Sequence, residues 1–354
     1  MKPFSLFLTA IFIAAIFFLS PQMVTQAQTA ADAPKNYQLI ETKISTMGAF
    51  EQWLEGVKEE ARGQGISEFT LGYALRDIQP IARIIELDRR QPEFTLTLGQ
   101  YLNNAISASR VKKARRKFSE NRELLKELQK KYQVPGRFIV ALWGIESDFG
   151  NHTGGFSVIN ALTTLAHDGR RSAYFRKELM NALKIIDQGH VTAGDMMGSW
   201  AGAMGQTQFM PSTFLSYATD HDGDGRIDIW NSSPDALASG ANYLLKAGWN
   251  PDLTWGREVI LPDRFDPKLA GKDNPRYLSA WSLYGVRSAD GGSLPKRAIK
   301  GAIIFPEKKK RGKKDAPGEL GRAFLVYDNF SVILDWNRSN FFAIAVGRLA
   351  DQIY

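Results

Sequence analysis

Apolar residues recur at helical spacing along much of the chain, and this pattern predicts a mainly helical protein. Phe50, Trp53 and Val57 fall on one face of a helix. A second helical pattern covers residues 119–132, where leucines share one face and Ser119 is a candidate N-cap.

The most apolar helical segment covers residues 137–146 and reads Arg-Phe-Ile-Val-Ala-Leu-Trp-Gly-Ile-Glu. It is apolar on all sides, which is typical of a helix buried in the centre of a domain. Pro135 precedes it and can occupy the first position of a helix. Further helices are predicted over 170–187, from Pro211, over 233–248 with Ser233 as N-cap, and over about 339–353.

The pattern changes after Trp249, where residues 302–305 and 323–327 have strand character. The fold class expected from the pattern is therefore α+β, predominantly helical, with small β elements near the C-terminus. A run of basic residues, 307–314, lies between the two strands. It is interpreted either as a solvated hairpin tip or as an electrostatic contact with an acidic polymer or membrane.

The N-terminus has the order of regions found in a secretory signal. Lys2 precedes an apolar run over 4–19, and a stretch of small residues follows at 25–27. The run is shorter than the about 20 apolar residues that a membrane span needs. We expect a signal peptide over 1–27, with an uncleaved anchor as the alternative, and a flexible leader over 28–46.

Composition narrows the possible chemistry. The chain of 354 residues has a formal net charge of +8, which favours polyanionic partners without choosing among them. It contains no cysteine, so disulfides, thiolate catalysis and cysteine-ligated metals are excluded. Its four histidines have no metal-binding spacing.

Glu146 is the strongest candidate for catalysis, because it ends the most apolar helix with Trp143 on the same side. A carboxylate buried with no cation nearby in sequence is costly, so its pKa should rise. A carboxylic acid that is protonated near neutral pH can protonate the leaving oxygen of a glycosidic bond. The alternative is a buried glutamate paired with a distant arginine such as Arg170 or Arg171.

Most glycosidases need a second carboxylate, and Asp148 is the near candidate. Two residues along a helix correspond to a rotation of about 200°, so its side chain should point away from that of Glu146. The sequence offers no obvious second catalytic acid. This fits a substrate that supplies its own nucleophile.

Several long motifs together resemble the lytic murein transglycosylase B family. They occur in order and at matching spacing over about residues 50–353. The motifs are Trp-Gly-Ile-Glu-Ser-Asp-Phe-Gly (143–150), Gly-Ala-Met-Gly-Gln-Thr-Gln-Phe-Met-Pro-Ser (202–212), Asp-Gly-Asp-Gly-Arg-Ile-Asp-Ile-Trp (222–230), Ala-Asn-Tyr-Leu (241–244), Asn-Phe-Ser-Val-Ile (329–333) and Trp-Asn-Arg-Ser-Asn (336–340).

The resemblance implies a lysozyme-like fold and a carbon–oxygen lyase that acts on peptidoglycan. Such an enzyme cleaves the β-1,4 bond between N-acetylmuramic acid and N-acetylglucosamine and forms 1,6-anhydromuramic acid, here with Glu146 as sole acid/base. The alternatives are a hydrolytic muramidase of the same fold and a non-catalytic peptidoglycan-binding scaffold. The domain would cover 47–353, as a helical lobe (about 47–133), a catalytic core (about 134–250) and a C-terminal part (about 251–353).

The resemblance also implies residues that bind substrate. Ser199 and Gln208 match positions near the catalytic glutamate. Arg170 and Arg171 match a pair that could bind the lactyl carboxylate or peptide stem of muramic acid, or only solvate a helix start. The remaining matched positions are Tyr174 and Tyr243, which flank sugar subsites, Tyr101, a cleft tyrosine, and Asn337, a polar cleft residue.

Two positions depart from the family pattern. This chain has Trp336 and Phe342 where some members have tyrosines. The loss of these hydroxyls puts hydrogen bonds at both positions in doubt, whereas stacking on a sugar would survive.

An acidic loop predicts a structural calcium ion, and we expect no cofactor to be required for the chemistry. Acidic residues at alternate positions followed by glycine resemble the start of a calcium loop, but its twelfth position is Asn231 rather than glutamate. The family closes a variant loop with a later aspartate. The ligands would be Asp220, Asp222, Asp224, the carbonyl of Arg226, and Asp235; a solvated acidic turn is the alternative.

Together these features predict an exported, periplasmic protein, with association to the inner or outer membrane through its N-terminus as an open alternative. The expected partners are peptidoglycan glycan strands, with other cell-wall enzymes as an open alternative, and no nucleic acid is expected.

Overall fold

The computed structural model describes residues 35–89, 96–307 and 321–354, with side chains from residue 48 onward. The predicted signal peptide and most of the basic run over 307–314 lie outside the described residues. Within the described ranges, no helix combines the length and the apolar character needed to cross a membrane. The chain forms two compact units, each built from separate segments: unit 1 contains residues 96–152 and 217–354, and unit 2 contains residues 35–89 and 153–216.

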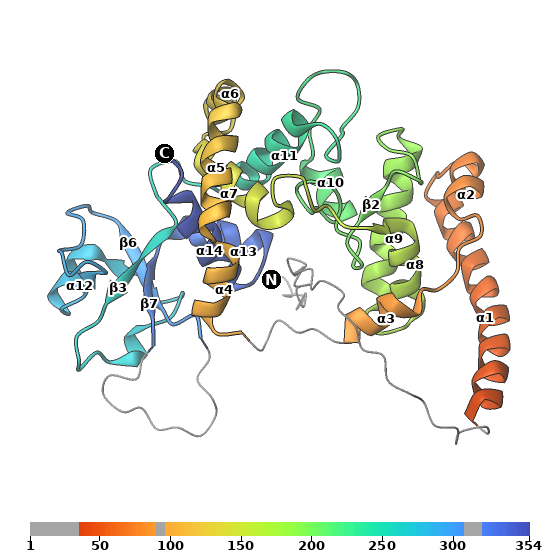
Figure 1. Cartoon of the computed structure of the whole chain (residues 1–354), viewed down its shortest axis with the longest axis horizontal. Helices are drawn as coiled ribbons and strands as arrows, with labels where there is room; N and C mark the ends of the chain where they lie inside the picture. Colours follow the sequence, from red (N-terminus) through yellow and green to blue (C-terminus); the bar gives the residue numbers. More distant parts are fainter. Residues whose placement is uncertain (1–34, 90–95, 308–320) are drawn as a thin grey trace, which may run out of the picture. The chain divides into compact units, whose positions relative to one another are not determined.

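Unit 2 is helical, with one very small sheet. Its helices α8 and α9 lie side by side (Figure 1). Strands β1 (Phe156–Ser157) and β2 (Met197–Gly198) pair antiparallel. The helices are α1 (Lys35–Gly63), α2 (Glu68–Ala74), α3 (Ala82–Arg89), α8 (Val158–His167), α9 (Ser172–Asp187) and α10 (Pro211–Tyr217), whose last residue belongs to unit 1.

Helix α1 begins earlier than the sequence pattern predicts. The flexible leader expected over 28–46 is helical from Lys35 onward, and its first part, 28–34, lies outside the described residues. The physical reason is that residues 35–46 contain neither proline nor glycine, so nothing interrupts the helix. Pro34 directly precedes the helix, at a position where proline is well tolerated.

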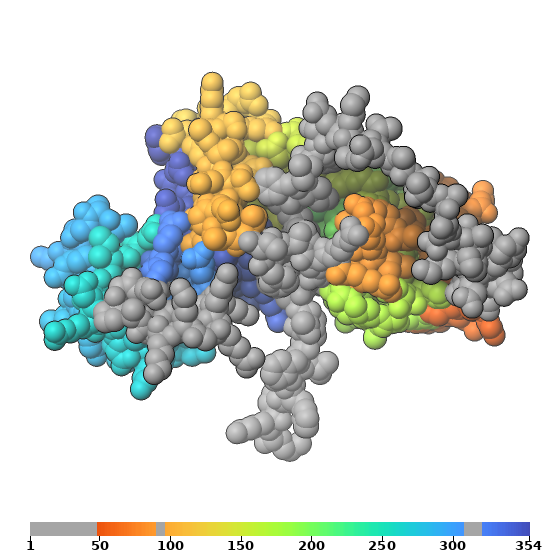
Figure 2. Space-filling model, turned by 60° about the horizontal axis from the view of Figure 1, so that its bottom comes forward, coloured from red at the N-terminus to blue at the C-terminus, as the bar shows by residue number. Residues whose placement is uncertain are grey.

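Unit 1 is arranged around α7 (Gly136–Ser147), whose residues from Phe138 to Ile145 are all buried. The predicted central apolar helix is therefore confirmed. Figure 2 shows the helices between 96 and 132 against C-terminal residues of the same unit. The helices that pack on α7 are α5 (Ala108–Glu120), α6 (Arg122–Tyr132), α11 (Ser233–Lys246) and α14 (Asn340–Ala350), and unit 1 also contains α4 (Leu98–Ala105), α12 (Leu278–Leu283), α13 (Asp328–Trp336) and the short 3-10 helix η2 (Pro267–Leu269).

A five-stranded antiparallel sheet forms the rest of unit 1, in the order β4-β6-β7-β3-β5. It has its own small core around the fully buried Trp281, and α12 lies beside it (Figure 1). Both predicted strands are confirmed as β6 and β7, which pair with each other. The strands are β3 (Gly256–Ile260), β4 (Arg276–Tyr277), β5 (Arg287–Ser288), β6 (Lys300–Ile304) and β7 (Ala323–Val326).

Three predicted helix starts are displaced by a few residues. Ser119 lies inside α5, and α6 begins after Asn121. Ser232, rather than Ser233, caps α11, because its hydroxyl accepts from the backbone N–H of Asp235. Pro135 occupies the N-cap position of α7 rather than its first turn. Differences of a few residues at a helix end are expected, because local sequence alone does not decide the boundary.

The three consecutive parts expected within 47–353 differ from the two units. The segment 47–133 supplies residues to both units, and so does 134–250. Sequence order misses this arrangement because the chain leaves unit 1 after His152 and returns to it at Tyr217.

One glycine of the core allows a test of packing in unit 1. A Cβ atom at Gly347 of α14 would lie 2.2 Å from Cδ2 of Trp255. This ring has no room to move, because it is fully buried and its Nε1 donates to Asp351 Oδ2 at 2.9 Å. We expect Gly347→Ala to lower the free energy of unfolding by about 2–3 kcal/mol, measured by chemical denaturation.

Gly72→Ala in α2 is the matched control, since no atom lies within 4 Å of the added methyl group. It should leave stability unchanged or raise it by up to about 1 kcal/mol. Equal effects of the two substitutions would contradict the packing of Gly347 on Trp255.

Candidate active site

Glu146 lies in the last turn of α7, one residue before the helix ends at Ser147. Its side chain is partly buried, and it belongs to a helix whose residues from Phe138 to Ile145 are all buried. The indole Nε1 of Trp336, at the end of α13, donates a hydrogen bond of 2.7 Å to Glu146 Oε1. This contact joins two residues that are 190 positions apart in the sequence.

Burial raises the pKa of Glu146 to about 8, and the hydrogen bond from Trp336 opposes this shift. No Lys, Arg or His of the described chain forms an ion pair with Glu146. The alternative of a salt bridge to Arg170 or Arg171 is wrong, because both arginines bind Asp88 in unit 2. Glu146 therefore carries its proton at neutral pH, as its sequence surroundings predict.

Aromatic rings continue outward from Glu146 within unit 1. The ring of Tyr243 lies 4.8 Å from that of Trp336 and 4.8 Å from that of Tyr217, measured between centroids. Burial raises the pKa of the Tyr243 hydroxyl, so this group stays protonated. The predicted residue Tyr243 is thus close to the residue that binds Glu146, and Tyr217 is an additional aromatic residue that no motif indicated.

Trp336 and Phe342, the two positions where some family members have tyrosine, lie in different surroundings. Trp336 keeps a hydrogen bond, because its indole N–H donates to Glu146. The ring of Phe342 is buried in the core of unit 1, so the stacking role expected for it is wrong. Adjacent residues of a helix point in different directions, so only one of the two phenylalanines faces the core. Phe342 faces it, whereas Phe341 on α14 is less buried.

The two other predicted residues of unit 1 have polar or aromatic contacts of their own. Asn337 is buried, and its Oδ1 accepts from the backbone N–H of Ser339 at 3.1 Å, at the start of α14. Tyr101 on α4 is partly buried, and its ring lies 5.7 Å from that of Phe341. Their roles in binding sugar stay predictions.

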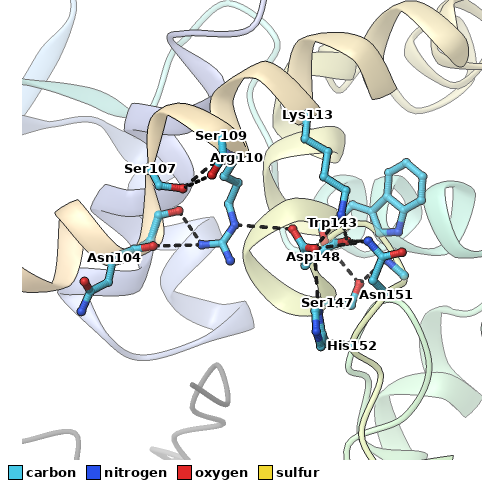
Figure 3. A network of polar contacts seen from close by, with 12 residues as sticks. Asn104, Ser107, Ser109, Arg110, Lys113, Trp143, Ser147, Asp148, Asn151 and His152 are labelled. Atoms are coloured by element: carbon cyan, nitrogen blue, oxygen red, sulfur yellow. Dashed lines mark hydrogen bonds and ion pairs between the residues drawn. The ribbon is translucent and has the colours of Figure 1, made fainter. Parts of the chain in front are cut away.

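Asp148 is engaged in a polar network with residues of α5 and of the turn after α7 (Figure 3). Its Oδ2 accepts from Lys113 Nζ at 2.6 Å and from Asn151 Nδ2 at 3.2 Å, and its Oδ1 lies 3.8 Å from Arg110 Nε. Although burial opposes it, these contacts hold the pKa of Asp148 below its usual value. Asp148 is therefore a paired carboxylate whose contacts favour its charged form, which agrees with the prediction that it is not the second acid.

Ser199 and Gln208 lie in unit 2, in the loop between β2 and α10. The hydroxyl of Ser199 accepts from the backbone N–H groups of Ala201 and Ala203 at 3.3 and 3.0 Å. Gln208 has a φ of +51°, and its amide donates to the carbonyls of Thr153 and Gly205 at 3.0 and 2.9 Å. Both side chains therefore shape the loop, and their predicted proximity to Glu146 stays a prediction.

Arg170 and Arg171 form an ion-pair cluster with the buried Asp88 at the end of α3. Arg170 donates from Nε to Asp88 Oδ2 at 2.6 Å and from Nη2 to the Asp88 carbonyl at 2.8 Å. The pKa of Asp88 is held below its usual value by the two guanidinium groups, against the effect of burial. Tyr174, one turn into α9, is partly buried, and its ring meets the edge of Phe175 at 5.3 Å.

The acidic loop between α10 and α11 brings three of the predicted calcium ligands together. Carboxylate oxygens of Asp220, Asp222 and Asp235 lie within 4.8 Å of one another. Burial, and then the charges of Asp222 and Asp220, raise the pKa of Asp235. Three crowded carboxylates of this kind are ligands that a hard cation such as Ca²⁺ prefers, so these residues fit the predicted ion.

The other residues of this loop have different contacts. Asp224 is outside the group of three, and its Oδ1 accepts from the backbone N–H of Arg226 at 2.8 Å. Asp228, which the motif did not single out, accepts from the backbone N–H groups of Trp230 and Asn231. The predicted ligation by Asp224 and by the carbonyl of Arg226 stays a prediction.

The chain is similar in sequence and in structure to known transglycosylases. A protein-family model described as the Transglycosylase SLT domain matches residues 49–351. Membrane-bound lytic murein transglycosylase B of Escherichia coli (strain K12) is 40% identical over 119 residues, which are 33% of this chain and 33% of that protein. The matched part thus spans one third of the length of this curated relative.

Solved structures are similar over most of the chain. A crystal structure of SltB3 from Pseudomonas aeruginosa in complex with NAG-anhNAM-pentapeptide has a TM-score of 0.79 and 42% identity, covering 85% of this chain and 78% of that chain. Soluble lytic transglycosylase SltB1 from Pseudomonas aeruginosa has a TM-score of 0.71 and 30% identity, covering 85% and 97%. The predicted fold class, mainly helical α+β of the lysozyme-like type, is confirmed by these similarities.

The raised pKa of Glu146 predicts a pH-dependent stability. Between its ordinary value of 4.5 and about 8, the folded protein keeps a proton that the unfolded chain releases. The stability of the wild-type protein should therefore fall as the pH rises through this window. Glu146→Gln has no carboxyl group at this position, so its stability should not fall for this reason. We expect the free energy of unfolding of Glu146→Gln minus that of wild type to increase by about 2 kcal/mol or more between about pH 5 and about pH 9, measured by thermal unfolding.

The control is Glu123→Gln, at an exposed residue of α6. Its difference from wild type should show no comparable change over the same pH window. A difference between Glu146→Gln and wild type that is constant with pH would mean that Glu146 titrates like an exposed carboxyl group.

Proposed function

Because the chain belongs to the Transglycosylase SLT domain family, we propose that it is a lytic transglycosylase of peptidoglycan. It cleaves the β-1,4 bond between N-acetylmuramic acid and N-acetylglucosamine and leaves a 1,6-anhydromuramic acid end. Similarity to SltB3, crystallised with NAG-anhNAM-pentapeptide and with NAG-NAM-pentapeptide, supports this substrate. The single observation that carries the mechanism is a lone carboxyl group, Glu146, whose pKa of about 8 keeps it protonated.

In the first step Glu146 acts as a general acid. The bond between C1 of muramic acid and the bridging oxygen breaks, its electron pair stays on that oxygen, and the oxygen takes the proton of Glu146. The pKa of about 8 makes this proton available at neutral pH. The indole N–H of Trp336 then stabilises the carboxylate that the transfer leaves behind.

In the second step the same group acts as a general base. The C6 hydroxyl of the muramic acid attacks C1 and forms the anhydro bond, and its proton returns to Glu146. No water is consumed, and the enzyme ends in its starting protonation state. An intramolecular nucleophile has a high effective molarity, which accounts for a site without a second catalytic carboxylate. The engagement of Asp148 by Lys113 agrees with this scheme.

The aromatic residues next to Glu146 supply a surface for sugars. We infer that Tyr243 and Tyr217 contact the apolar faces of sugar rings. Both are only partly buried, Tyr243 adjoins Trp336, and Tyr217 adjoins Tyr243. Ser199 and Gln208 are proposed to contact the sugar that is distorted during cleavage. Tyr174 is proposed to flank a sugar subsite, and Arg170 and Arg171 to bind the lactyl carboxylate or peptide stem of muramic acid.

We also propose that Asp220, Asp222 and Asp235 hold a structural calcium ion. The proximity of their oxygen atoms within 4.8 Å supports this proposal. The ion would neutralise the three carboxylates and fix the loop that begins α11, the helix that carries Tyr243. It takes no part in the cleavage.

Action outside the cytoplasm follows from the substrate, since peptidoglycan lies there. The signal-like N-terminus supports export, and the E. coli relative is named as membrane-bound. We propose a periplasmic enzyme.

The acid/base role of Glu146 predicts the behaviour of a substituted enzyme. Glu146→Gln should lower the release of soluble fragments from purified peptidoglycan sacculi by at least about 100-fold, because an amide cannot donate and then accept the proton. Liquid chromatography with mass spectrometry measures the fragments. Wild-type fragments should end in anhydromuramic acid, one water lighter than a reducing end.

Glu123→Gln is the control and should keep wild-type turnover. Fragments with reducing ends would indicate a hydrolytic muramidase, and binding of sacculi without any product would indicate a scaffold. Near-normal turnover of Glu146→Gln would exclude this residue as the acid/base.

The calcium proposal predicts a change in thermal stability. Adding excess chelator should lower the melting temperature of the wild-type protein, and calcium at about 100 times its dissociation constant should restore about 2.7 kcal/mol of stability. In Asp222→Asn the effect of the chelator should be smaller, because one carboxylate of the group is lost. An identical melt with chelator and with calcium would argue against bound calcium.

A further inference from the structure

We propose that Lys113 and Asp148 are positioning residues for Glu146: their ion pair fixes the backbone at the end of α7 and thereby holds the Glu146 carboxyl group against Trp336. The catalytic part of this inference rests on the proposed function. The structural part does not, because it concerns where one carboxyl group lies within unit 1.

The backbone just after Glu146 has an unusual conformation. Helix α7 ends at Ser147, and the next three residues have positive φ angles: +48° at Asp148, +61° at Phe149 and +83° at Gly150. Glycine adopts this conformation readily, but a left-handed conformation costs roughly 1–2 kcal/mol for each residue with a side chain. Two such residues in succession need contacts that offset this cost.

Contacts within the turn close it back onto α7. The backbone N–H of Phe149 donates to the carbonyl of Trp143 at 3.1 Å. The hydroxyl of Ser147 donates to the same carbonyl at 3.2 Å and accepts from the N–H of Gly150 at 3.0 Å. The helical turn that these bonds complete is the turn that carries Glu146.

Lys113 of α5 ties this turn to a second helix. Its Nζ donates to Asp148 Oδ2 at 2.6 Å and to the Asp148 carbonyl at 3.1 Å, so it holds both the side chain and the backbone (Figure 3). Asn151 Nδ2 donates to the same carbonyl at 2.8 Å. The side chains of Lys113 and Asp148 are each 23% exposed, which makes the pair less screened by solvent than a surface pair.

Apolar packing next to the Lys113–Asp148 pair also connects it to α7. The ammonium group of Lys113 lies 5.3 Å from the ring centroid of Phe149. That ring is buried against α7, since a Cβ atom at Gly144 would lie 2.7 Å from it. Arg110, which lies one turn before Lys113, donates to the carbonyls of Asn104 and Ala105 at the end of α4.

The Lys113–Asp148 ion pair affects where the Glu146 carboxyl group lies more than it affects the electrostatic potential at that group. Helix ends fray unless they are capped, and an unfixed last turn would let Glu146 move away from the indole N–H of Trp336. A displacement of about 1 Å can cost about 100-fold in catalysis. The pair should therefore matter for turnover beyond its contribution to stability.

The charged groups near α7 are few. Helix α5 presents Arg110, Lys113 and Lys117 to it, and Lys117 also pairs with Glu120 at 2.8 Å. Near the ends of α7, Asp148 also lies 3.7 Å from His152, and Arg137 lies 3.8 Å from Asp351. On the other helices packed against α7, Arg348 of α14 pairs with Glu258 at 2.6 Å, and the charged side chains of α6 and Lys246 of α11 are exposed.

Two substitutions separate position from charge, with the pKa of Glu146 as the readout. Lys113→Met removes the cation closest to Asp148 and leaves only the more distant Arg110, so less of the negative charge of Asp148 is neutralised, which by itself would raise the pKa of Glu146. Release of the turn would instead expose Glu146 to water, which lowers its pKa, and would remove the hydrogen bond from Trp336, which raises it. The net pKa should fall, because burial is the larger of these two influences on Glu146. We expect a decrease of at least about one unit from about 8, measured on the full chain by ¹³C NMR of labelled glutamate carboxyl groups and assigned with Glu146→Gln.

The same variants should show the loss in turnover. We expect Lys113→Met and Asp148→Asn to lower kcat about 10- to 100-fold and to leave KM within about threefold. Lys113→Arg, which can still pair with Asp148, should stay within about threefold of wild type in kcat. Asp148→Asn keeps the shape of the side chain and serves as the second variant if Lys113→Met does not fold.

Glu258→Gln is the matched control, because Glu258 is another ion-paired residue of unit 1 with 23% exposure, bound by Arg322 and Arg348 at 2.7 and 2.6 Å. It should lower the melting temperature without changing the pKa of Glu146 or kcat. A raised or unchanged pKa of Glu146 in Lys113→Met would overturn the proposal. If the wild-type protein released no product, the proposed function would fail, whereas the titration of Glu146 would still test the positioning.

Discussion

The hydrogen bond between Trp336 and Glu146 is the contact on which the site depends. A carboxyl group in apolar surroundings prefers to keep its proton, and a single indole donor leaves that preference largely intact. A cation in the same place would have fixed the group as a carboxylate and removed its acid function. The use of a neutral donor is therefore a condition for one side chain to serve as acid and then as base, with the donor present to stabilise the charge between the two steps.

Much of this could be predicted from sequence where short segments carry enough information. The uninterrupted apolar character of 137–146 predicts a central helix, and a glutamate at its end predicts a raised pKa. The alternation to β-type segments after Trp249 predicts the strands β6 and β7. These predictions succeed because burial and strand formation depend mainly on the local distribution of apolar side chains.

The sequence fails where the decisive contact joins distant segments or where neighbouring residues compete. Nothing near Trp336 indicates that its N–H meets Glu146, and nothing near Lys113 indicates that it binds Asp148. Phe342 was expected in the cleft because a motif matches there, but packing decides which of two adjacent phenylalanines is buried. The division of the chain into two units, each built from separate segments, likewise depends on long-range contacts, and the composition of the connecting segments does not indicate it.

The interleaving of the two units has a consequence for biosynthesis. Both segments of unit 2 have been synthesised once residue 216 is added, whereas α7 must wait for α11, α13 and α14 to cover it. During that interval α7, which is almost entirely buried in the folded protein, lacks these partners, and its contacts with them have high sequence separation. Until its C-terminal helices are synthesised, the nascent protein therefore exposes apolar surface that the folded protein buries.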